Sequence, residues 1–254
     1  MLEVIIMKRN SIVILLIALI VNSCTKDSVS GGGQTTGAGG STARFTILGN
    51  YLYVVDNTSL KAFDISNTGA APVLKTTTDV GINIETIFPY QDKLFIGSSF
   101  AMHIFSVANP ERPVKLAMAE YIIRMSCDPV VAKDSTAYAT LNSSGPCGGG
   151  GSQLVVYNIK DFANPVLKTS IPLIAPYGLG ISDSALYVCE GSSGLKVYNT
   201  RNTYSPQFVS TISGGTFYDV IPYGNILICQ LSNGLALYDI STRHQPVFLS
   251  RLLN

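Results

Sequence analysis

Hydrophobic and polar positions alternate in short runs from about residue 44 onward, and one such run recurs five times along the chain. Its copies begin at Leu60, Met102, Leu154, Leu195 and Leu235, at steps of 42, 52, 41 and 40 residues. Period-two alternation in segments rich in β-branched and aromatic residues predicts β-strands. Self-similarity at a nearly constant step is typical of a repeat architecture.

Each repeat contains four apolar runs separated by turn residues; in the first they cover about 44–48, 51–55, 60–65 and 72–76. Four short strands per repeat is the strand count of a propeller blade. The sequence therefore predicts an all-β fold, a β-propeller of five four-stranded blades. The repeats cover about residues 44–82, 83–122, 123–174, 175–213 and 214–254.

A proline opens the fourth run of every repeat: Pro72, Pro113, Pro165, Pro206 and Pro246. Proline lacks an amide donor and is tolerated at strand starts and in edge strands, so we expect the fourth strand to be the outermost of each blade. The sequence leaves open whether the last run completes the fifth blade or joins the first.

Both faces of the third run carry apolar side chains, as expected for strands between neighbouring blades. One aromatic recurs in this run, and we expect it to pack between blades: Phe63, Phe105, Tyr157, Tyr198 and Tyr238. An insertion near residues 142–151 accounts for the 52-residue step of the third repeat.

The repeated Leu-x-Val-Tyr-Asp pattern, followed by Pro-Val or Asn-Pro-Val, resembles the LVIVD repeat of bacterial and archaeal cell-surface proteins. The resemblance covers residues 44–254 and departs from the pattern at Ser106 and at the insertion. It implies one propeller blade per repeat and an extracytoplasmic location. It supplies no activity and no site residues.

The N-terminus has the layout of a bacterial export signal, with Lys8 and Arg9 before an apolar run over 12–21. The segment 21–24 is similar to a lipobox, so we expect a signal peptide over 1–23 and a lipid on Cys24. The alternative is a transmembrane helix, but roughly 20 apolar residues are needed to span a bilayer. The protein is then lipid-anchored outside the cytoplasm, with the membrane as a partner.

Residues 24–43 contain the acylated cysteine and a segment of Gly, Ser and Thr without apolar periodicity, which predicts a flexible tether. Lys26-Asp27 resembles a signal that sends lipoproteins to the cell surface. Display on the surface of an outer membrane and retention at its inner leaflet both stay open.

Charge excludes one class of partner. The mature chain has 15 basic and 15 acidic residues, so no basic stripe predicts nucleic-acid binding. Outside the cytosol, Cys127 and Cys147 either form a disulfide or stay as free thiols. Cys189 and Cys229 are expected to be buried apolar groups at equivalent positions of the second strand.

Catalysis is poorly supported by the sequence. Neither of the two histidines, His103 and His244, has a second ligand at metal spacing, and we expect His103 on a solvated strand position because other repeats carry lysine there. No cofactor, metal or catalytic residue is predicted. The alternative is a propeller glycoside hydrolase or lyase that uses channel-mouth carboxylates. The candidates are Glu85, Asp128, Glu190 and Asp219.

Binding is the preferred function, because loops on a rigid scaffold commonly carry recognition. The candidate residues lie on connections between the second and third strands and between repeats: Tyr121, Arg124, Tyr177, Glu190, Phe217, Tyr218, Gln230 and Asn233. Tyrosines beside amides and acids suit a glycan or a protein segment. We therefore expect a non-catalytic interaction module at the membrane.

Overall fold

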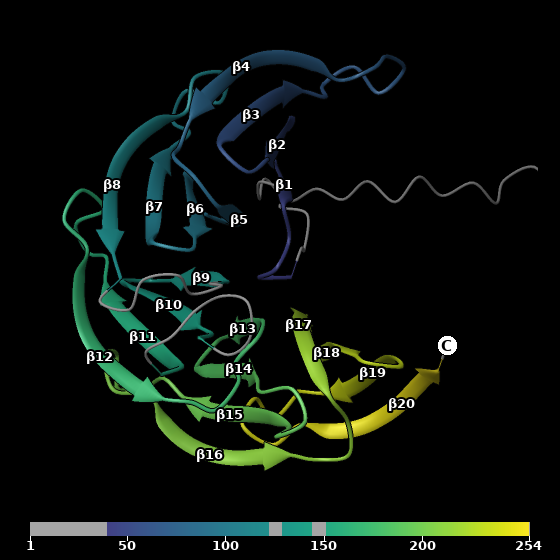
Figure 1. Cartoon of the computed structure of the whole chain (residues 1–254). Helices are drawn as coiled ribbons and strands as arrows, with labels where there is room; N and C mark the ends of the chain where they lie inside the picture. The colour runs from purple at the N-terminus through teal and green to yellow at the C-terminus, as the bar shows by residue number, and fades with distance from the viewer. Residues whose placement is uncertain (1–39, 122–128, 144–150, 254) are drawn as a thin grey trace, which may run out of the picture. The chain divides into compact units, whose positions relative to one another are not determined.

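The structure is a computed structural model that describes residues 40–121, 129–143 and 151–253. The described residues form twenty strands in five antiparallel four-stranded sheets. Among them, no helix is long and apolar enough to cross a membrane. The predicted all-β propeller with four strands per repeat is confirmed (Figure 1).

Sheet one consists of β1 (Phe45–Leu48), β2 (Tyr51–Val55), β3 (Ser59–Asp64) and β4 (Val73–Asp79). Sheet two consists of β5 (Ile84–Tyr90), β6 (Lys93–Ser98), β7 (Ala101–Ser106) and β8 (Val114–Glu120). Sheet three consists of β9 (Val130–Lys133), β10 (Thr136–Leu141), β11 (Gln153–Asn158) and β12 (Val166–Pro172).

Sheet four consists of β13 (Leu179–Ser182), β14 (Ala185–Cys189), β15 (Leu195–Asn199) and β16 (Gln207–Ile212). Sheet five consists of β17 (Phe217–Tyr223), β18 (Ile226–Leu231), β19 (Gly234–Asp239) and β20 (Val247–Leu253). Strands follow sequence order in every sheet, so the proline-led run is outermost each time. The last run completes sheet five, because β20 pairs with β19.

The pairing of the third and fourth strands contains the same irregularity in all five sheets. Its register shifts immediately before the recurring aromatic, as at Ala62/Phe63 and Leu237/Tyr238. Such a bulge increases the local twist. The long outer strands curve accordingly around the other three strands of each sheet (Figure 1).

The sheets pack through their first strands: β1 against β5, β5 against β9, β9 against β13, and β13 against β17. Four apolar clusters fill the interfaces between successive sheets. The recurring aromatic is buried in sheets two to five, as at Phe105 and Tyr238. Its predicted role in packing between blades is confirmed there, while Phe63 of sheet one is half-buried.

A second aromatic position, in the second strand, connects one sheet to the next. Tyr53, Phe95, Tyr138 and Tyr187 occupy it in sheets one to four, and all four are buried. The hydroxyl of Tyr53 donates to Pro110 O at 3.0 Å, and that of Tyr187 donates to Arg243 O at 2.6 Å. Both acceptors lie in the connection between the third and fourth strands of the following sheet. These bonds hold adjacent sheets in register.

Sheets one and five each have a face that no described sheet covers. On sheet five, Leu235 is 39% exposed and Ile228 is half-buried, whereas the residues that pack sheet four on sheet five are fully buried. On sheet one, Phe45 is 60% exposed. Figure 1 shows these two sheets at opposite ends of the series.

Candidate binding face

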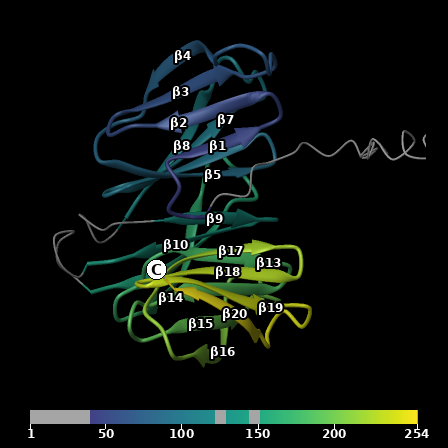
Figure 2. The same ribbon diagram turned by 90° about the vertical axis from the view of Figure 1, so that its right-hand side faces the viewer.

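Four of the predicted site residues come together between sheets four and five: Tyr177, Glu190, Phe217 and Tyr218. Backbone bonds assemble them: Tyr177 N donates to Cys189 O at 2.8 Å, and Gly178 N donates to Tyr218 O at 2.8 Å. Gly191 and Phe217 exchange two further bonds, at 3.0 and 3.1 Å. The β14–β15 turn and the two inter-sheet connections therefore form one framework, seen from the side in Figure 2.

Tyr177 and Tyr218 form the accessible part of this framework. Their rings meet edge to face, with centroids 5.0 Å apart, which is a favourable aromatic geometry. Tyr177 is 37% exposed and Tyr218 is half-buried. Gly191 lies against the Tyr177 ring: a Cβ added there would come within 3.0 Å of it, and the φ of 53° also favours glycine. The glycine thus permits the close approach of the ring.

Glu190 is fully buried, so its prediction as an accessible binding residue is wrong. Its Oε1 accepts the amide of Ile174 at 2.9 Å, and its Oε2 pairs with Lys196 Nζ at 2.5 Å. A buried carboxylate needs such partners to offset its desolvation. Glu190 therefore holds the connection before Tyr177 against β15.

The remaining candidates divide between core and surface. Phe217 and Tyr121 are buried in apolar clusters, which gives them structural roles. Gln230 and Asn233 are exposed on sheet five, and Gln230 pairs across the strands with Asp219, the residue after Tyr218. Arg124 lies outside the described residues.

Asp219 binds a short segment that precedes the first sheet. Ser41 Oγ and Thr42 Oγ1 donate to its two carboxylate oxygens at 3.2 and 2.6 Å, and Val220 N donates at 3.0 Å. Ser41 Oγ also accepts the amide of Leu179, and Ile87 N donates to Ala43 O. These residues belong to the segment predicted as a tether. In the structure, residues 40–43, here called the N-terminal strap, pack on β5, β13 and β17.

Burial raises the pKa of Asp219, and the hydroxyl of Thr42 is the main opposing influence. Burial also raises the pKa of Glu85, which accepts Ser99 Oγ at 2.9 Å. The carboxylates of Asp219, Glu85 and Glu190 thus each contact different residues of the fold. Asp128 lies outside the described residues.

No group of three or more His, Cys, Asp or Glu suited to a metal ion occurs within residues 40–121, 129–143 and 151–253. The expectation of a solvated His103 is wrong: the side chain is 4% exposed, because β7 lies between sheets one and three. The equivalent position carries lysine in sheets one and four, and a lysine pattern predicts a solvated side chain.

Cys189 and Cys229 are buried and free, as expected. They are not equivalent, however. Cys189 pairs with Leu195, whereas Cys229 pairs with Ala236 and Gln230 takes the place opposite Leu235. Both thiols therefore face the interface of sheets four and five, and burial raises the pKa of Cys229 to about 12. The predicted pair Cys127 and Cys147 lies outside the described residues.

Comparison with known proteins agrees with this architecture. The LVIVD repeat family matches residues 39–80, which include the N-terminal strap and all of sheet one. The chain therefore contains an LVIVD repeat over these residues. A search of curated proteins found no match.

Solved structures share the fold of this propeller at low identity. A periplasmic gluconolactonase, PpgL, from Pseudomonas aeruginosa has a TM-score of 0.64 and 16% identity, over 81% of this chain and 68% of that one. A putative 6-phosphogluconolactonase from Bacteroides uniformis has a TM-score of 0.61 and 13% identity, over 83% and 68%. BamB from Moraxella catarrhalis has a TM-score of 0.55 and 13% identity, over 74% and 54%. At these identities the likeness shows the fold alone.

Proposed function

We propose that this LVIVD-repeat propeller is a non-catalytic interaction module that binds a glycan at the Tyr177–Tyr218 pair. The exposed edge of this pair carries the proposal. A tyrosine ring offers an apolar face and a hydroxyl, which suits the apolar face and the hydroxyls of a sugar. Gln230 on β18 and Asn233 in the β18–β19 turn are exposed as well, and their amides can form hydrogen bonds.

The surroundings of the pair support binding without turnover. Retaining and inverting glycosidases need two carboxyl groups facing each other across the substrate. Here Glu190 is neutralised by Lys196, and Asp219 is held by Ser41 and Thr42. Both acids therefore serve the fold. Two of the similar solved structures are named as lactonases, so lactone hydrolysis is the catalytic reaction that the experiment must test.

The test measures binding and turnover on one purified sample of the full chain. A glycan array reports saturable binding, while release of reducing sugar and hydrolysis of gluconolactone report catalysis. We expect binding without turnover. Tyr177→Ala and Tyr218→Ala should each weaken binding by roughly tenfold, about 1.4 kcal/mol.

Tyr223→Ala is the matched control, because Tyr223 is an exposed tyrosine at the opposite end of β17. It should leave glycan affinity unchanged. Turnover of either substrate would overturn the non-catalytic part of the proposal. Absence of glycan binding by the wild type would overturn the proposal that the ligand is a glycan. Cross-linking on intact cells would then identify a protein partner.

We also propose that a lipid on Cys24 holds the module at a bacterial membrane, on the periplasmic side or at the cell surface. Each buried methylene of an acyl chain contributes about 0.8 kcal/mol to membrane binding. Growth with labelled palmitate should label the wild type and leave Cys24→Ser unlabelled. Digestion of intact cells with protease distinguishes the two locations, since only a surface-exposed protein is cleaved.

A further inference from the structure

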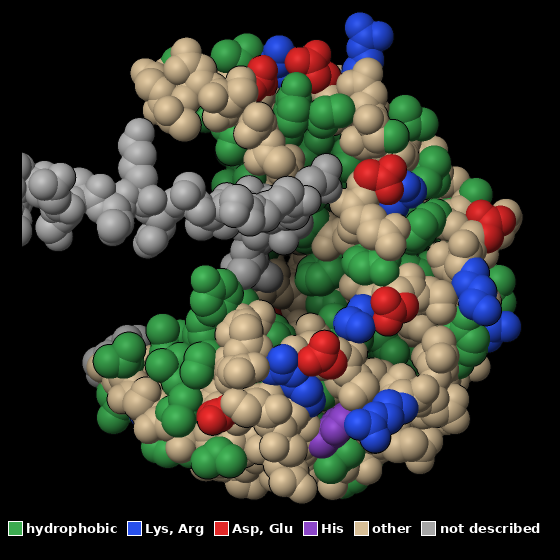
Figure 3. All heavy atoms as spheres, turned by 180° about the vertical axis from the view of Figure 1, so that it is seen from behind, with side chains coloured by type: hydrophobic (Ala, Val, Ile, Leu, Met, Phe, Trp, Pro, Cys, Tyr) green, Lys and Arg blue, Asp and Glu red, His purple; other side chains and the backbone are tan. Residues whose placement is uncertain are grey.

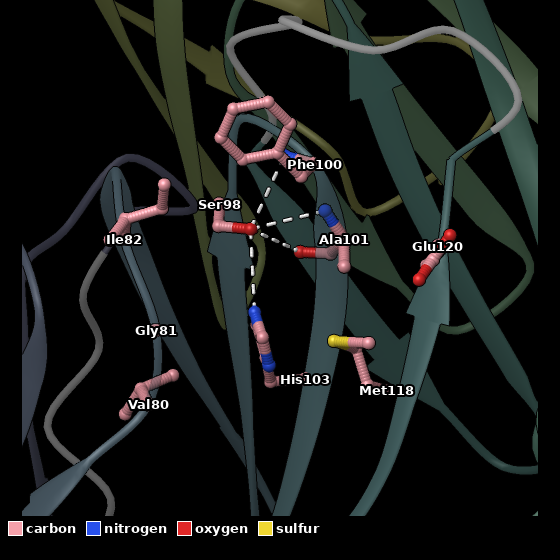
Figure 4. A pocket seen from close by; sticks show the side chains of 9 residues that line it. All are labelled: Val80, Gly81, Ile82, Ser98, Phe100, Ala101, His103, Met118 and Glu120. Carbon is pink, nitrogen blue, oxygen red and sulfur yellow. Dashed lines mark hydrogen bonds between the residues drawn. The ribbon is translucent and has the colours of Figure 1, made fainter.

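A cavity of about 270 Å³ lies between sheets one and two, away from the tyrosine pair. The connection from β4 to β5 forms one wall with Val80, Gly81 and Ile82. Strands β6, β7 and β8 form the other, with Ser98, His103 and Met118 among its residues (Figure 4).

His103 is the polar group inside this cavity. It pairs with Ile96 across the β6–β7 ladder and is 4% exposed. The equivalent positions carry lysine in sheets one and four and apolar residues in sheets three and five. Histidine at this position gives the interface of sheets one and two an imidazole, whereas the lysine of sheet four, Lys196, pairs with Glu190.

The bonds of Ser98 determine which ring nitrogen of His103 carries the proton. The single hydroxyl proton of Ser98 points to Ala101 O at 3.0 Å, and the amides of Ala101 and Phe100 donate to Ser98 Oγ. His103 Nε2 lies 3.3 Å from that oxygen, and we assign it as the donor because the Ser98 proton already bonds to Ala101 O. Burial and the charge of Lys115 lower the pKa of His103 to about 4, so the ring is neutral at pH 7. Nδ1 is then an acceptor.

Among the described residues, none lies within hydrogen-bonding distance of His103 Nδ1, and the atom is buried. A buried acceptor without a partner is costly, so this nitrogen favours a donor from outside the fold. The wall beside it is bare. Gly81 has no side chain, and a Cβ added there would stand 3.9 Å from Cε1 of the ring. Figure 4 shows the imidazole edge-on between Gly81 and Met118.

The other walls are apolar and open to solvent. Ile82 is 61% exposed and Met118 is 47% exposed, although both are large apolar side chains beside a cavity. Exposed apolar surface around a few polar groups is typical of a small-molecule site. Glu120 lines the cavity from β8, and Lys115 Nζ, also on β8, donates to Val80 O at 3.4 Å. The two opposite charges favour a neutral ligand.

We propose that this cavity binds a neutral organic molecule with a flat apolar body and one N–H or O–H group, which donates to Nδ1 of His103. Val80, Ile82 and Met118 contact the apolar body. The site is separate from the tyrosine pair, so it does not depend on the proposed glycan function.

Two probes of nearly equal shape test this assignment: indole, which has an N–H donor, and 1-methylindole, which lacks it. The chain contains two histidines, so the full-length protein labelled with ¹⁵N-histidine gives two sets of ring signals. We expect indole to shift the Nδ1 signal of His103 saturably, and 1-methylindole to bind at least tenfold more weakly. His244 is the internal control, because its Nε2 already lies 2.9 Å from Ser184 O.

A variant separates the hydrogen bond from the cavity itself. His103→Leu removes the acceptor and keeps the site apolar, so it should bind both probes with similar affinity. If that variant does not fold, the comparison of indole with 1-methylindole on the wild type still tests whether the N–H donor contributes to binding. Equal affinities on the wild type, equal shifts at both histidines, or no saturable shift at millimolar probe would each overturn the proposal.

Discussion

Sheets four and five pair their second and third strands in the same way, but their corresponding faces differ in burial. The face of sheet four packs on sheet five, whereas the corresponding face of sheet five is covered by no described sheet. On sheet four, the cross-strand pairs Tyr187/Val197 and Cys189/Leu195 are completely buried. On sheet five, the corresponding pairs are Ile228/Leu237 and Gln230/Leu235, and none of the four residues is buried. Alternation determines which side chains share a face, but a neighbouring sheet determines whether that face is buried.

The sequence of sheet five reflects this difference. Ile228 stands where the first four sheets have a buried aromatic, and Gln230 stands where they have valine, glycine, threonine and cysteine. Side chains of sheet five are among the hydrophobic ones at the lower left of Figure 3. A smaller apolar residue and an amide reduce the exposed apolar area, as expected for a face in contact with water.

The largest expected effect comes from a pair of identical substitutions on the two faces. Leu195→Ala should lower the free energy of unfolding by about 3 kcal/mol, since it leaves a cavity between sheets four and five. Leu235→Ala, at the corresponding position, should cost less than about 1 kcal/mol because Leu235 is already 39% exposed. Urea unfolding measures both. Equal losses would show that the face of Leu235 is covered in solution.

The pH dependence of stability probes the interface of sheets one and two. The pKa of His103 is lowered in the folded state to about 4, against about 6.5 unfolded, so the unfolded chain takes up the proton first. The stabilisation is complete above pH 6.5 and is lost as the pH falls towards 4. Between pH 7 and 5 the loss should be about 2 kcal/mol.

His103→Leu is the control for this pH effect. The groups facing His103 are Ser98 on β6 and Lys115 on β8, with Glu120 in the same cavity. The raised pKa values of Glu85 and Asp219 act in the opposite direction, since their stabilisation grows as the pH falls. They contribute equally to both proteins. If the variant keeps the full slope between pH 7 and 5, His103 is not its source.

The N-terminal strap binds the otherwise open fifth sheet to the body. Thr42→Val removes the hydroxyl that donates to Asp219 at 2.6 Å and should cost about 1.5 kcal/mol. The loss should be larger at pH 7 than at pH 4, because the bond favours the charged carboxylate. Thr58→Val is the control: Thr58 donates to the exposed Asp56 at 3.4 Å and should cost under about 0.5 kcal/mol. Hydrogen exchange should accelerate in β17 only for Thr42→Val.

The smallest effect concerns the hydroxyls that connect adjacent sheets. Tyr53→Phe and Tyr187→Phe each remove one bond to a carbonyl of the next sheet and should cost about 1 kcal/mol. Tyr223→Phe, on the exposed end of β17, should have no measurable effect. Thermal unfolding of the three variants measures whether Tyr53→Phe and Tyr187→Phe lose more stability than Tyr223→Phe. A loss at Tyr223 equal to that at Tyr187 would contradict the assignment.

Much of the fold could be predicted because its signals are local. Alternation and turn residues identified the strands, and the five spaced prolines identified the outer strand of each sheet. The candidate site was predicted less well. Tyr177 and Tyr218 meet as a pair, but Glu190 and Phe217 are buried, and the burial of His103 depends on how sheet one packs against it.

The repeat, the order of the strands and the sets of side chains that share a face can all be derived from the amino-acid sequence, because they depend on neighbours in the chain and on a two-residue period. The burial of each face, the binding of the N-terminal strap to Asp219 and the place of His103 in a cavity become visible in the folded protein alone. Those properties depend on contacts between residues far apart in the chain, such as Thr42 and Asp219, and no local pattern records such contacts.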